Sequence, residues 1–600
     1  MRKLPGKFAF VSPMITFASL NLLFICAFAN CAQNEKVQKV IQSEPAKIVS
    51  RMTLEQKVGQ LIHVGMPGKK IGPAVTAELK QRFAGGVILF GMNLGSTAEI
   101  KSLNASLQKV ALSATGIPLF ISADQEGGRV RRVDGRSVDQ FPGAMAVGQT
   151  GDPELAREVG FVTAYKLREV GINIVLAPVL DVNNNPANPV INTRSFGSET
   201  KLVTNMGKAL AAGIRQAGST PTIKHFPGHG DTARDSHLTL PRIDKTLAQL
   251  EEMELVPFRS AIDDGAEIVM SAHILFPSLD PKYPATLSPS ILKNVLREKL
   301  KFGGLIMTDA MEMHAISKNY DQANAAKQAF RAGADIILLT SLGKISRNMY
   351  SALLQGFRSG ELSVTDLDAA VERQIALKLR KGLFYKHRSP LTPDPEMLKH
   401  YNTARAEINK RYRTIQEKYN TRGVSLNTSV SRASISSLRK PFPGLGGVKP
   451  ADIRIFTRSA TMRARARERG YPAVQVQAIG SPASLIGRLK KRPAQQVWVV
   501  EIPYKGEASW NKLAAALNAR ARAAAKAGRT YPMTVALHHG NPFAPIAIPA
   551  SGAVLESFSP TLESLRALID RALDGKPVRK AKLILGGDDN KIGPSGFPEG

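Results

Sequence analysis

Cysteine is almost absent from this chain of 600 residues. Its two cysteines, Cys26 and Cys31, both lie close to the N-terminus, so a framework of internal disulfides is excluded for the rest of the protein. Acidic residues are also in short supply, with 49 Asp and Glu against 81 Lys and Arg, which gives a formal net charge of +32. Aromatic residues make up only 6% of the sequence.

A charge of this size raises the question of nucleic acid binding. The basic residues are scattered, with denser runs at residues 378–381, 410–413 and 463–469. No zinc-finger spacing and no aromatic-rich RNA motif accompany these runs, so we predict no nucleic acid partner. Two interpretations stay open, a solvated cationic surface and a general attraction to an anionic cell-wall or membrane surface.

The N-terminus has the pattern of an export signal. Basic residues within positions 1–7 precede an uncharged, mostly apolar stretch at 8–29, which ends in Ala-Phe-Ala. This pattern predicts a secretory signal peptide over residues 1–29 and a periplasmic or cell-envelope location. Cys31 offers a second interpretation, because the segment 28–31 resembles a relaxed bacterial lipobox. Under this second interpretation, the protein is a lipoprotein attached to the membrane through a lipidated Cys31.

The length and the 43% hydrophobic content predict one large domain and one smaller domain. In the first part of the chain, short apolar and β-branched runs alternate with helical patterns such as 97–112 and 152–170. Near-continuous apolar strands are typical of a parallel sheet covered on both faces, and eight such units predict a (β/α)8 barrel. The runs are residues 61–64, 86–90, 118–122, 172–177, 220–223, 267–270, 304–307 and 335–339.

The pattern changes after the barrel. A basic, helical stretch at 396–419 and a Ser, Pro and Gly-rich linker at 428–450 precede a second set of short apolar runs, which predicts a smaller α/β sandwich. We therefore divide the chain into a signal peptide at 1–29, a barrel at 30–385, a helical segment and linker at 386–450, a sandwich domain at 451–590 and a disordered tail at 591–600.

Polar residues follow five of the predicted barrel strands. Because the active site of such a barrel lies where the strands end, these residues predict a functional site at one face. They are Asp124, Asp181, the pair Lys224 and His225, His273, and Asp309.

The block KHFPGHGDTARDSH at residues 224–237 is the most informative of these segments. Its proline and glycines predict a loop that begins at the end of a strand. Within this loop Asp235 and His237 can share a proton, which suits the imidazole to general acid/base chemistry. Two alternatives remain for the histidines at 225, 229 and 237, a metal site with Asp231 and Asp235 or a purely structural role. The glycines oppose the helix on which His-x-x-x-His zinc spacing depends.

Several motifs together resemble glycoside hydrolase family 3, and in particular its β-N-acetylglucosaminidase (β-N-acetylhexosaminidase) branch. The motifs occur in the family's order between residues 53 and 383. They are DQEGGRVRR at 124–132, RSFG at 194–197, the block at 224–237, SAH at 271–273 and GLIMTDAM at 304–311. The region after residue 423 resembles, more faintly, the α/β sandwich of two-domain members. In the β-glucosidase branch that domain contributes the acid/base glutamate, a role that the His-Asp pair takes here.

The resemblance implies a role for eight residues and implies no cofactor and no metal. Asp309 becomes the nucleophile of a retaining glycosidase, His237 the acid/base and Asp235 its orienting partner. For Asp309 an N-cap of a helix starting near Ala310 is the alternative, compatible with the first role. The residues expected to grip the sugar are Asp124, Arg132, Arg194, Lys224 and His225.

The sequence thus predicts an exported, exo-acting β-N-acetylhexosaminidase that removes terminal N-acetylglucosamine from peptidoglycan fragments or chitin-type chains. A β-glucosidase or xylosidase and a glycosyl phosphorylase are alternatives on the same fold. A non-catalytic, wall-binding lipoprotein is the alternative of another class. The oligomeric state stays open.

Overall fold

The computed structural model describes residues 35–134, 137–236, 238–392, 395–421 and 425–434, and short segments between residues 436 and 567. The predictions for the signal peptide, Cys31, His237 and the tail at 591–600 lie outside the described residues.

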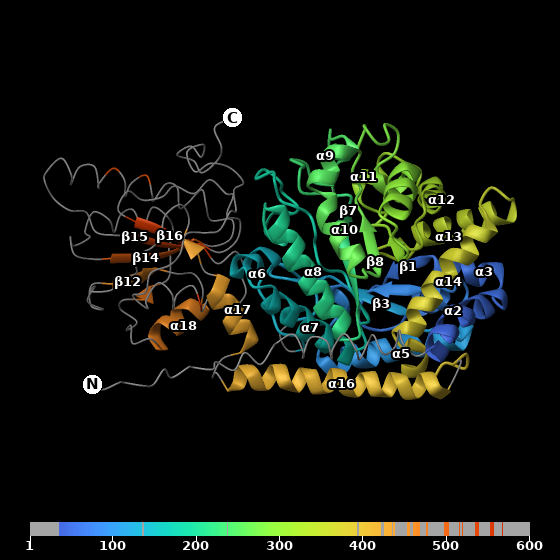
Figure 1. The fold of residues 1–600 in the computed structure, drawn as a ribbon, viewed down its shortest axis with the longest axis horizontal. Helices are drawn as coiled ribbons and strands as arrows, with labels where there is room; N and C mark the ends of the chain where they lie inside the picture. The colour runs from blue at the N-terminus through green and yellow to red at the C-terminus, as the bar shows by residue number, and fades with distance from the viewer. Residues whose placement is uncertain are drawn as a thin grey trace, which may run out of the picture.

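Eight parallel strands form the first domain, in the order β10-β1-β2-β3-β6-β7-β8-β9 (Figure 1). A bridge between Met307 and Ile336 joins the last strand to the first, so the sheet closes into a barrel. Each of the eight predicted runs overlaps one of these strands, which confirms the predicted barrel. The strands are β1 Ile62–Gly65, β2 Gly86–Ile88, β3 Phe120–Ala123, β6 Ile174–Val175, β7 Thr220–Phe226, β8 Ile268–Ser271, β9 Leu305–Met307 and β10 Ile337–Leu338.

Helices surround this barrel and pack against its outer face (Figure 1). Helix α3 begins at a capping box, in which Thr53 Oγ1 accepts from the Gln56 N–H at 3.3 Å and the Gln56 side chain accepts from the Thr53 N–H at 3.0 Å. The sequence predicts this capping box at residues 53–56 and a helix that runs toward His63, but the helix ends at Gln60 and β1 begins at Ile62. The α-helices are α2 Glu35–Ser50, α3 Leu54–Gln60, α4 Pro73–Lys80, α5 Thr97–Thr115, α6 Ala144–Thr150, α7 Pro153–Glu169, α8 Thr200–Gln216, α9 Leu247–Glu252, α10 Leu255–Asp263, α11 His314–Ser317, α12 Gln322–Ala332, α13 Lys344–Arg358, α14 Val364–Arg380 and α15 Leu383–Lys386.

Shorter elements lie in the loops between strands and helices. A two-stranded ribbon, β4 and β5, follows β3, and four further helical segments complete the domain. These elements are β4 Gln125–Gly127, β5 Val130–Arg131, η1 Gly91–Asn93, η2 Asn192–Arg194, η3 Ala285–Leu287 and η4 Ser290–Lys299.

The inside of the barrel is a separate apolar layer made by inward-facing strand residues. Because side chains alternate along a strand, residues two positions apart reach this layer together, as Ile268 and Met270 of β8 do. Leu377 of α14 and Leu383 of α15 belong to the same layer, so these two helices close the end at which the strands begin. The strand residues in the layer are Ile88, Phe120, Ile174, Leu176, Ile268, Met270, Leu305, Met307, Ile336 and Leu338.

The segment after the barrel folds back onto it. The predicted basic helix is α16, Pro395–Asn420, which lies along α7 with the rings of Tyr165 and Tyr412 stacked at 4.0 Å (Figure 1). A second helix, α17 Leu426–Ser434, packs on α6 and α7. It occupies the start of the predicted linker at 428–450, so that part of the interpretation is wrong. Small polar residues suggested a linker there, whereas tertiary packing holds them in a helix.

The C-terminal part contains a six-stranded sheet in the order β11-β16-β15-β14-β12-β13. All of its pairs are parallel except that of β11 with β16. The sequence predicts five apolar runs here, at 453–456, 474–478, 497–502, 533–537 and 554–557, and each overlaps a strand. It also predicts helices at 510–526 and 562–572, which lie almost wholly outside the described residues. The elements are β11 Ser436–Ser437, β12 Ile453–Phe456, α18 Ala460–Glu468, β13 Val476–Gln477, β14 Val497–Ile502, β15 Thr534–His538 and β16 Gly552–Glu556.

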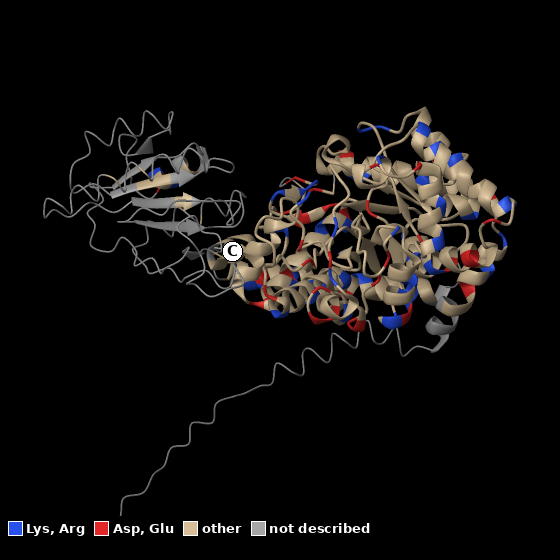
Figure 2. Cartoon of the chain, turned by 90° about the horizontal axis from the view of Figure 1, so that it is seen from above, with Lys and Arg blue, Asp and Glu red and all other residues tan. Residues whose placement is uncertain are grey.

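Charged residues are spread along the barrel helices, with Lys and Arg interspersed with Asp and Glu in the view of Figure 2. Within the described ranges, no helix has the length and apolar composition needed to cross a bilayer.

Candidate active site

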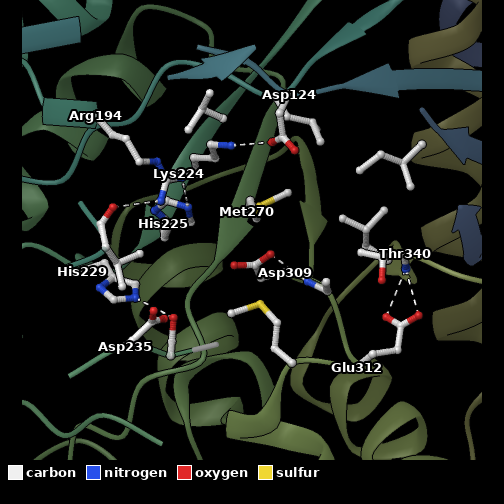
Figure 3. Close-up of a pocket in the computed structure, with 18 of the residues that line it drawn as sticks. Asp124, Arg194, Lys224, His225, His229, Asp235, Met270, Asp309, Glu312 and Thr340 are labelled. Carbon is white, nitrogen blue, oxygen red and sulfur yellow. Dashed lines mark hydrogen bonds and ion pairs between the residues drawn. The ribbon is translucent and has the colours of Figure 1, made fainter. Parts of the chain in front are cut away.

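A cavity of about 730 Å³ opens at the end of the barrel where the strands finish. Its lining brings together seven of the eight predicted site residues, although they come from distant parts of the chain (Figure 3). The eighth, His237, is outside the described residues. The seven are Asp124, Arg132, Arg194, Lys224, His225, Asp235 and Asp309.

One wall of the cavity is a network of paired charges. Lys224 Nζ lies 2.9 Å from Asp124 Oδ1 and 2.7 Å from Glu126 Oε1. Arg194 grips the same Glu126 carboxylate with two N–H groups, each at 2.9 Å, and Arg132 reaches Asp124 at 3.1 Å. Two buried carboxylates therefore hold three cations in fixed positions around the opening, which is the arrangement that makes buried charges tolerable.

The pKa values follow from this pairing. Burial opposes ionisation of Asp124 and Glu126, but the neighbouring Lys and Arg charges outweigh it and lower the pKa of both carboxyls. For the same reason the pKa of Lys224 and that of Arg194 are raised in spite of burial. The whole network is thus ionised at neutral pH.

Lys224 and His225 are neighbours in β7, yet both line the cavity. Consecutive side chains of a regular strand point to opposite faces, but the pairing of β7 with β8 shifts between Lys224 and Phe226. This irregularity in the pairing lets the side chains of both Lys224 and His225 point into the cavity. The predicted loop therefore begins later than residue 224, because β7 continues to Phe226.

Asp181 lies behind His225 and holds it. Its Oδ2 is 2.7 Å from His225 Nδ1, and its Oδ1 accepts from the backbone N–H groups of His225 at 3.2 Å and His229 at 2.7 Å. Burial opposes ionisation of Asp181, but the two histidines outweigh it and lower the pKa of this carboxyl. With its Nδ1 on Asp181, His225 presents Nε2 to the cavity side, 3.3 Å from Arg194.

His229 anchors the loop that carries Asp235. Its Nε2 lies 2.9 Å from Ser236 Oγ, and both side chains are buried. Burial, helped by the nearby His225, lowers the pKa of His229 to about 4, so the ring is neutral at pH 7. Gly230 makes this loop path possible, because a Cβ there would collide with the Val182 carbonyl at 1.7 Å.

Asp309 lies just after β9, at the centre of the cavity in Figure 3. Burial raises its pKa, but His273, His225, the Ala310 N–H and Lys224 together lower it to about 2. Its Oδ1 accepts from the Ala310 N–H at 2.7 Å. The alternative role as an N-cap is wrong, since the next helix, α11, starts only at His314 and has Met313 at its N-cap.

His273 supports this segment from the end of β8. Its Nε2 lies 3.0 Å from the Ala310 carbonyl oxygen and its Nδ1 lies 2.8 Å from Thr286 Oγ1. The sequence reasoning named Asp181 and His273 only as polar residues after strands, and His229 only as a possible metal ligand or structural histidine. Glu126 lay inside the motif at 124–132 and was not singled out, although it pairs with both Lys224 and Arg194.

The remaining wall is largely apolar. Arg132 lies over the ring of Phe90 at 5.5 Å, and Met270 and Leu338 form part of the floor. At the far side the Glu312 carboxylate accepts from the N–H groups of Thr340 and Ser341. A cavity with one charged wall and one apolar wall suits a sugar ring, which has polar edges and C–H faces.

The metal interpretation finds no supporting geometry. Among the side chains that the structure describes, no group of three or more His, Cys, Asp and Glu is arranged to hold a metal ion. His225 has Asp181 at one ring nitrogen and the Arg194 guanidinium at the other, and a guanidinium excludes a cation from that position.

A parallel barrel with a buried, ionised carboxylate and a gripping network at its strand ends defines a barrel enzyme of the glycosidase type. The model of the glycosyl hydrolase family 3 N terminal domain matches residues 53–377. The chain belongs to glycosyl hydrolase family 3, and the resemblance seen in the sequence is confirmed.

Related proteins carry consistent names. Beta-hexosaminidase A of Pseudoalteromonas piscicida is 39% identical over 284 residues, which are 44% of this chain and 48% of that protein. The chain therefore spans about half the length of that relative. Beta-hexosaminidase LpqI of Mycobacterium tuberculosis is 32% identical, over 56% of this chain and 85% of that protein. A solved family 3 beta-N-acetylglucosaminidase from Paenibacillus sp. str. FPU-7 is similar with a TM-score of 0.72 at 31% identity, over 89% of this chain and 98% of that one.

Proposed function

We propose that the protein is a retaining, exo-acting β-N-acetylhexosaminidase in which Asp309 is the nucleophile. The observation that carries the proposal is the position of the Asp309 carboxylate. It follows a barrel strand, it lines a sugar-sized cavity, and its pKa is lowered to about 2. An ionised carboxylate in that place can attack an anomeric carbon and form a glycosyl-enzyme.

The acid/base role falls to His237 with Asp235 as its orienting partner. Asp235 lines the cavity, and its neighbour Ser236 is fixed to His229, so the end of this loop stands at the same opening as Asp309. In the first step the imidazolium protonates the departing oxygen while Asp309 bonds to the anomeric carbon. In the second step the neutral imidazole takes a proton from water, which attacks the same carbon and releases Asp309.

Recognition of the sugar is assigned to Asp124, Arg132, Arg194, Lys224 and His225. These groups are oriented before substrate arrives, because their charges bind one another in the empty cavity. Hydroxyl groups of a sugar can exchange hydrogen bonds with such fixed donors and acceptors without rearranging the wall. The arrangement therefore favours tight orientation of one terminal residue, which is what exo-acting cleavage requires.

The substrate class is inferred from relatives as well as from the cavity. The names Beta-hexosaminidase and beta-N-acetylglucosaminidase favour terminal N-acetylglucosamine over glucose or xylose. We propose peptidoglycan fragments or chitin-type oligosaccharides as the natural substrates, because both carry this sugar. Export through the signal pattern at 1–29, with or without a lipid on Cys31, would bring the enzyme to them.

The test is an assay with the p-nitrophenyl β-glycosides of N-acetylglucosamine, glucose and xylose, each with and without phosphate. We expect the N-acetylglucosaminide to be preferred and proton NMR to show the β-anomer as first product. Asp309→Ala should lose on the order of 10⁵-fold in kcat. An α-anomer as first product, or an active Asp309→Ala enzyme, would refute the retaining mechanism through Asp309.

The choice of substrate and the addition of phosphate in this assay distinguish the alternative activities. A preference for the glucoside or xyloside would assign the enzyme to the other branch of the family. A sugar 1-phosphate as the main product in phosphate buffer would make it a phosphorylase. Mass spectrometry of the native N-terminus decides localisation, since cleavage after Ala29 leaves Asn30 first and lipidation leaves an acylated Cys31.

A further inference from the structure

The histidine behind the nucleophile holds the chain on which Asp309 is mounted. His273 is buried, and both of its ring nitrogens are engaged, Nδ1 with Thr286 Oγ1 at 2.8 Å and Nε2 with the Ala310 oxygen at 3.0 Å. Ala310 in turn donates its N–H to Asp309 Oδ1 at 2.7 Å. A single residue therefore connects the imidazole to the carboxylate.

The hydrogen bond to Ala310 fixes one proton on the ring. A carbonyl oxygen only accepts, so Nε2 carries a proton for Ala310. The Thr286 hydroxyl has a single proton to donate, and it lies 2.8 Å from Ser271 Oγ and 3.0 Å from the Ala272 oxygen as well as 2.8 Å from His273 Nδ1. His273 therefore holds Ala310 through its Nε2–H, whether Nδ1 accepts from Thr286 in the neutral ring or donates to it in the imidazolium.

Titratable groups face the nucleophile from several elements. His225 and Lys224 of β7 face Asp309 from one side, and Glu312 and His314 follow it along its own segment in the cavity lining. His273 reaches it through Ala310 from the segment after β8, and it is one of the groups that lower the pKa of Asp309.

The remaining contacts of the segment lie on its other side. The Thr308 N–H donates to the Ile336 oxygen at 2.9 Å and the Met311 N–H to the Leu338 oxygen at 3.0 Å, both toward β10. These bonds fix the two ends of the segment against β10. The bond from His273 fixes its middle against β8, next to the reacting carboxylate.

We propose that His273 is a positioning residue that holds the Ala310 peptide through its Nε2–H and so aims the Asp309 carboxylate. The proposal rests on the proposed role of Asp309. The hydrogen bond sets the direction in which Asp309 attacks the anomeric carbon. When the glycosyl-enzyme breaks down, the bond from Asp309 to the anomeric carbon breaks, its electron pair returns to the carboxylate, and water bonds to the carbon after giving a proton to the acid/base group.

Four variants separate the hydrogen bond, the ability of the side chain to take up a proton, and folding. His273→Gln keeps a donor for Ala310 but cannot be protonated, and His273→Ala removes both. Thr286→Val removes the hydroxyl that contacts Nδ1. Thr222→Val is the matched control, because Thr222 is a buried threonine of β7 whose hydroxyl has no hydrogen-bond partner in the described part of the chain.

We expect kcat on the N-acetylglucosaminide to fall by about a hundredfold in His273→Ala, while KM changes less than threefold, because misplacing a reacting group by about 1 Å costs that much. Thr286→Val should lose less than His273→Ala, and Thr222→Val should keep the wild-type rate. In His273→Gln the acidic limb of the kcat/KM profile should move to higher pH, since Asp309 loses one of the groups that lower its pKa.

Thermal unfolding of each variant guards against loss of fold, and His273→Gln and Thr286→Val keep the test open if His273→Ala does not fold. A wild-type kcat in folded His273→Ala, or in folded Thr286→Val where His273→Ala does not fold, an unmoved acidic limb in His273→Gln, or an equal loss in Thr222→Val would overturn the proposal. If those results came with an inactive Asp309→Ala enzyme, the nucleophile would stand and only the role of His273 would fall.

Discussion

The two sides of the cavity hold their charges in different ways. On the gripping side, Lys224 touches two carboxylates and Arg194 binds one of them through two N–H groups, so each charge is neutralised by direct contact. On the reacting side, the hydrogen bond described for the Asp309 carboxylate comes from the N–H of its own neighbour. Groups that orient a substrate can be saturated with partners, while a nucleophile needs an oxygen that is left available for a covalent bond.

The end of the barrel where the strands begin sharpens this contrast. There Lys378 is fully buried, with the Gln60 side chain at 2.8 Å and the Gly85 oxygen at 3.2 Å. Burial lowers the pKa of Lys378 to about 7, whereas the pKa of Lys224 is raised by its two carboxylates. A buried lysine therefore marks a ligand-binding wall only when anionic partners keep it charged.

The largest effect is expected from breaking the gripping network. Lys224→Met leaves Asp124 and Glu126 without their shared cation, and removing one partner of a buried pair costs about 3–5 kcal/mol in the free energy of unfolding. Sugar binding should be lost as well. Arg242→Met is the control, because the Arg242 and Asp244 side chains are 59% and 65% exposed, and such an exposed pair contributes little to stability. Urea unfolding of both variants checks this, and equal destabilisation would contradict it.

The next effect concerns the acid/base group and separates it from the nucleophile. His237→Ala should slow cleavage of unactivated oligosaccharides by about 10²–10⁴-fold, because a sugar alcohol leaves poorly without a proton. An aryl glycoside with a good leaving group should still form the glycosyl-enzyme. Stopped-flow measurement should then show a burst of nitrophenol followed by slow release, and azide, which needs no base, should speed the slow phase. Equal losses on both substrates, with no burst, would remove His237 from this role.

Titration of the buried loop histidine gives a smaller effect. The pKa of His229 is about 4 in the folded protein and about 6.5 when unfolded, so the unfolded chain binds more protons between these values. His229 therefore lowers stability as the pH falls from 6.5 to 4, by on the order of 2 kcal/mol at pH 5. Urea unfolding across this range should show a shallower pH dependence in His229→Asn than in the wild type. His314→Asn is the control. It leaves His229 in place, so it should keep the part of the pH dependence of unfolding that comes from His229.

The smallest effect is expected from the hydroxyl that anchors the loop. Ser236→Ala removes the bond to His229, and a bond of this kind contributes about 0.5–1.5 kcal/mol, which corresponds to roughly a tenfold change in rate. The loss should be larger for poor leaving groups than for nitrophenol, because the loop carries the acid/base residue. Thr239→Ala is the matched control, because the Thr239 hydroxyl is exposed and its hydrogen bond to the Asp235 backbone oxygen is long, at 3.4 Å. A uniform loss in both variants would show that Ser236 has no special part in the acid step.

Most of the fold was predictable because barrel strands are buried on both faces and therefore read as short apolar runs. The eight runs and the polar residues after them located the barrel and the face of the site. The linker at 428–450 could not be read in the same way. Small polar residues are compatible with a loop or a helix, and the contacts of α17 with α6 and α7 decide between the two.

The sequence by itself determined the composition of the site, since Asp124, Lys224 and Asp309 each stand directly after or at the end of an apolar run. Only the tertiary structure decided how they cooperate. The shifted pairing between β7 and β8 turns Lys224 and His225 to the same side. Closure of the barrel brings His273 against the Ala310 carbonyl and Asp181 against His225. These contacts join residues 37 and 44 positions apart, and local sequence patterns contain no information on such distances.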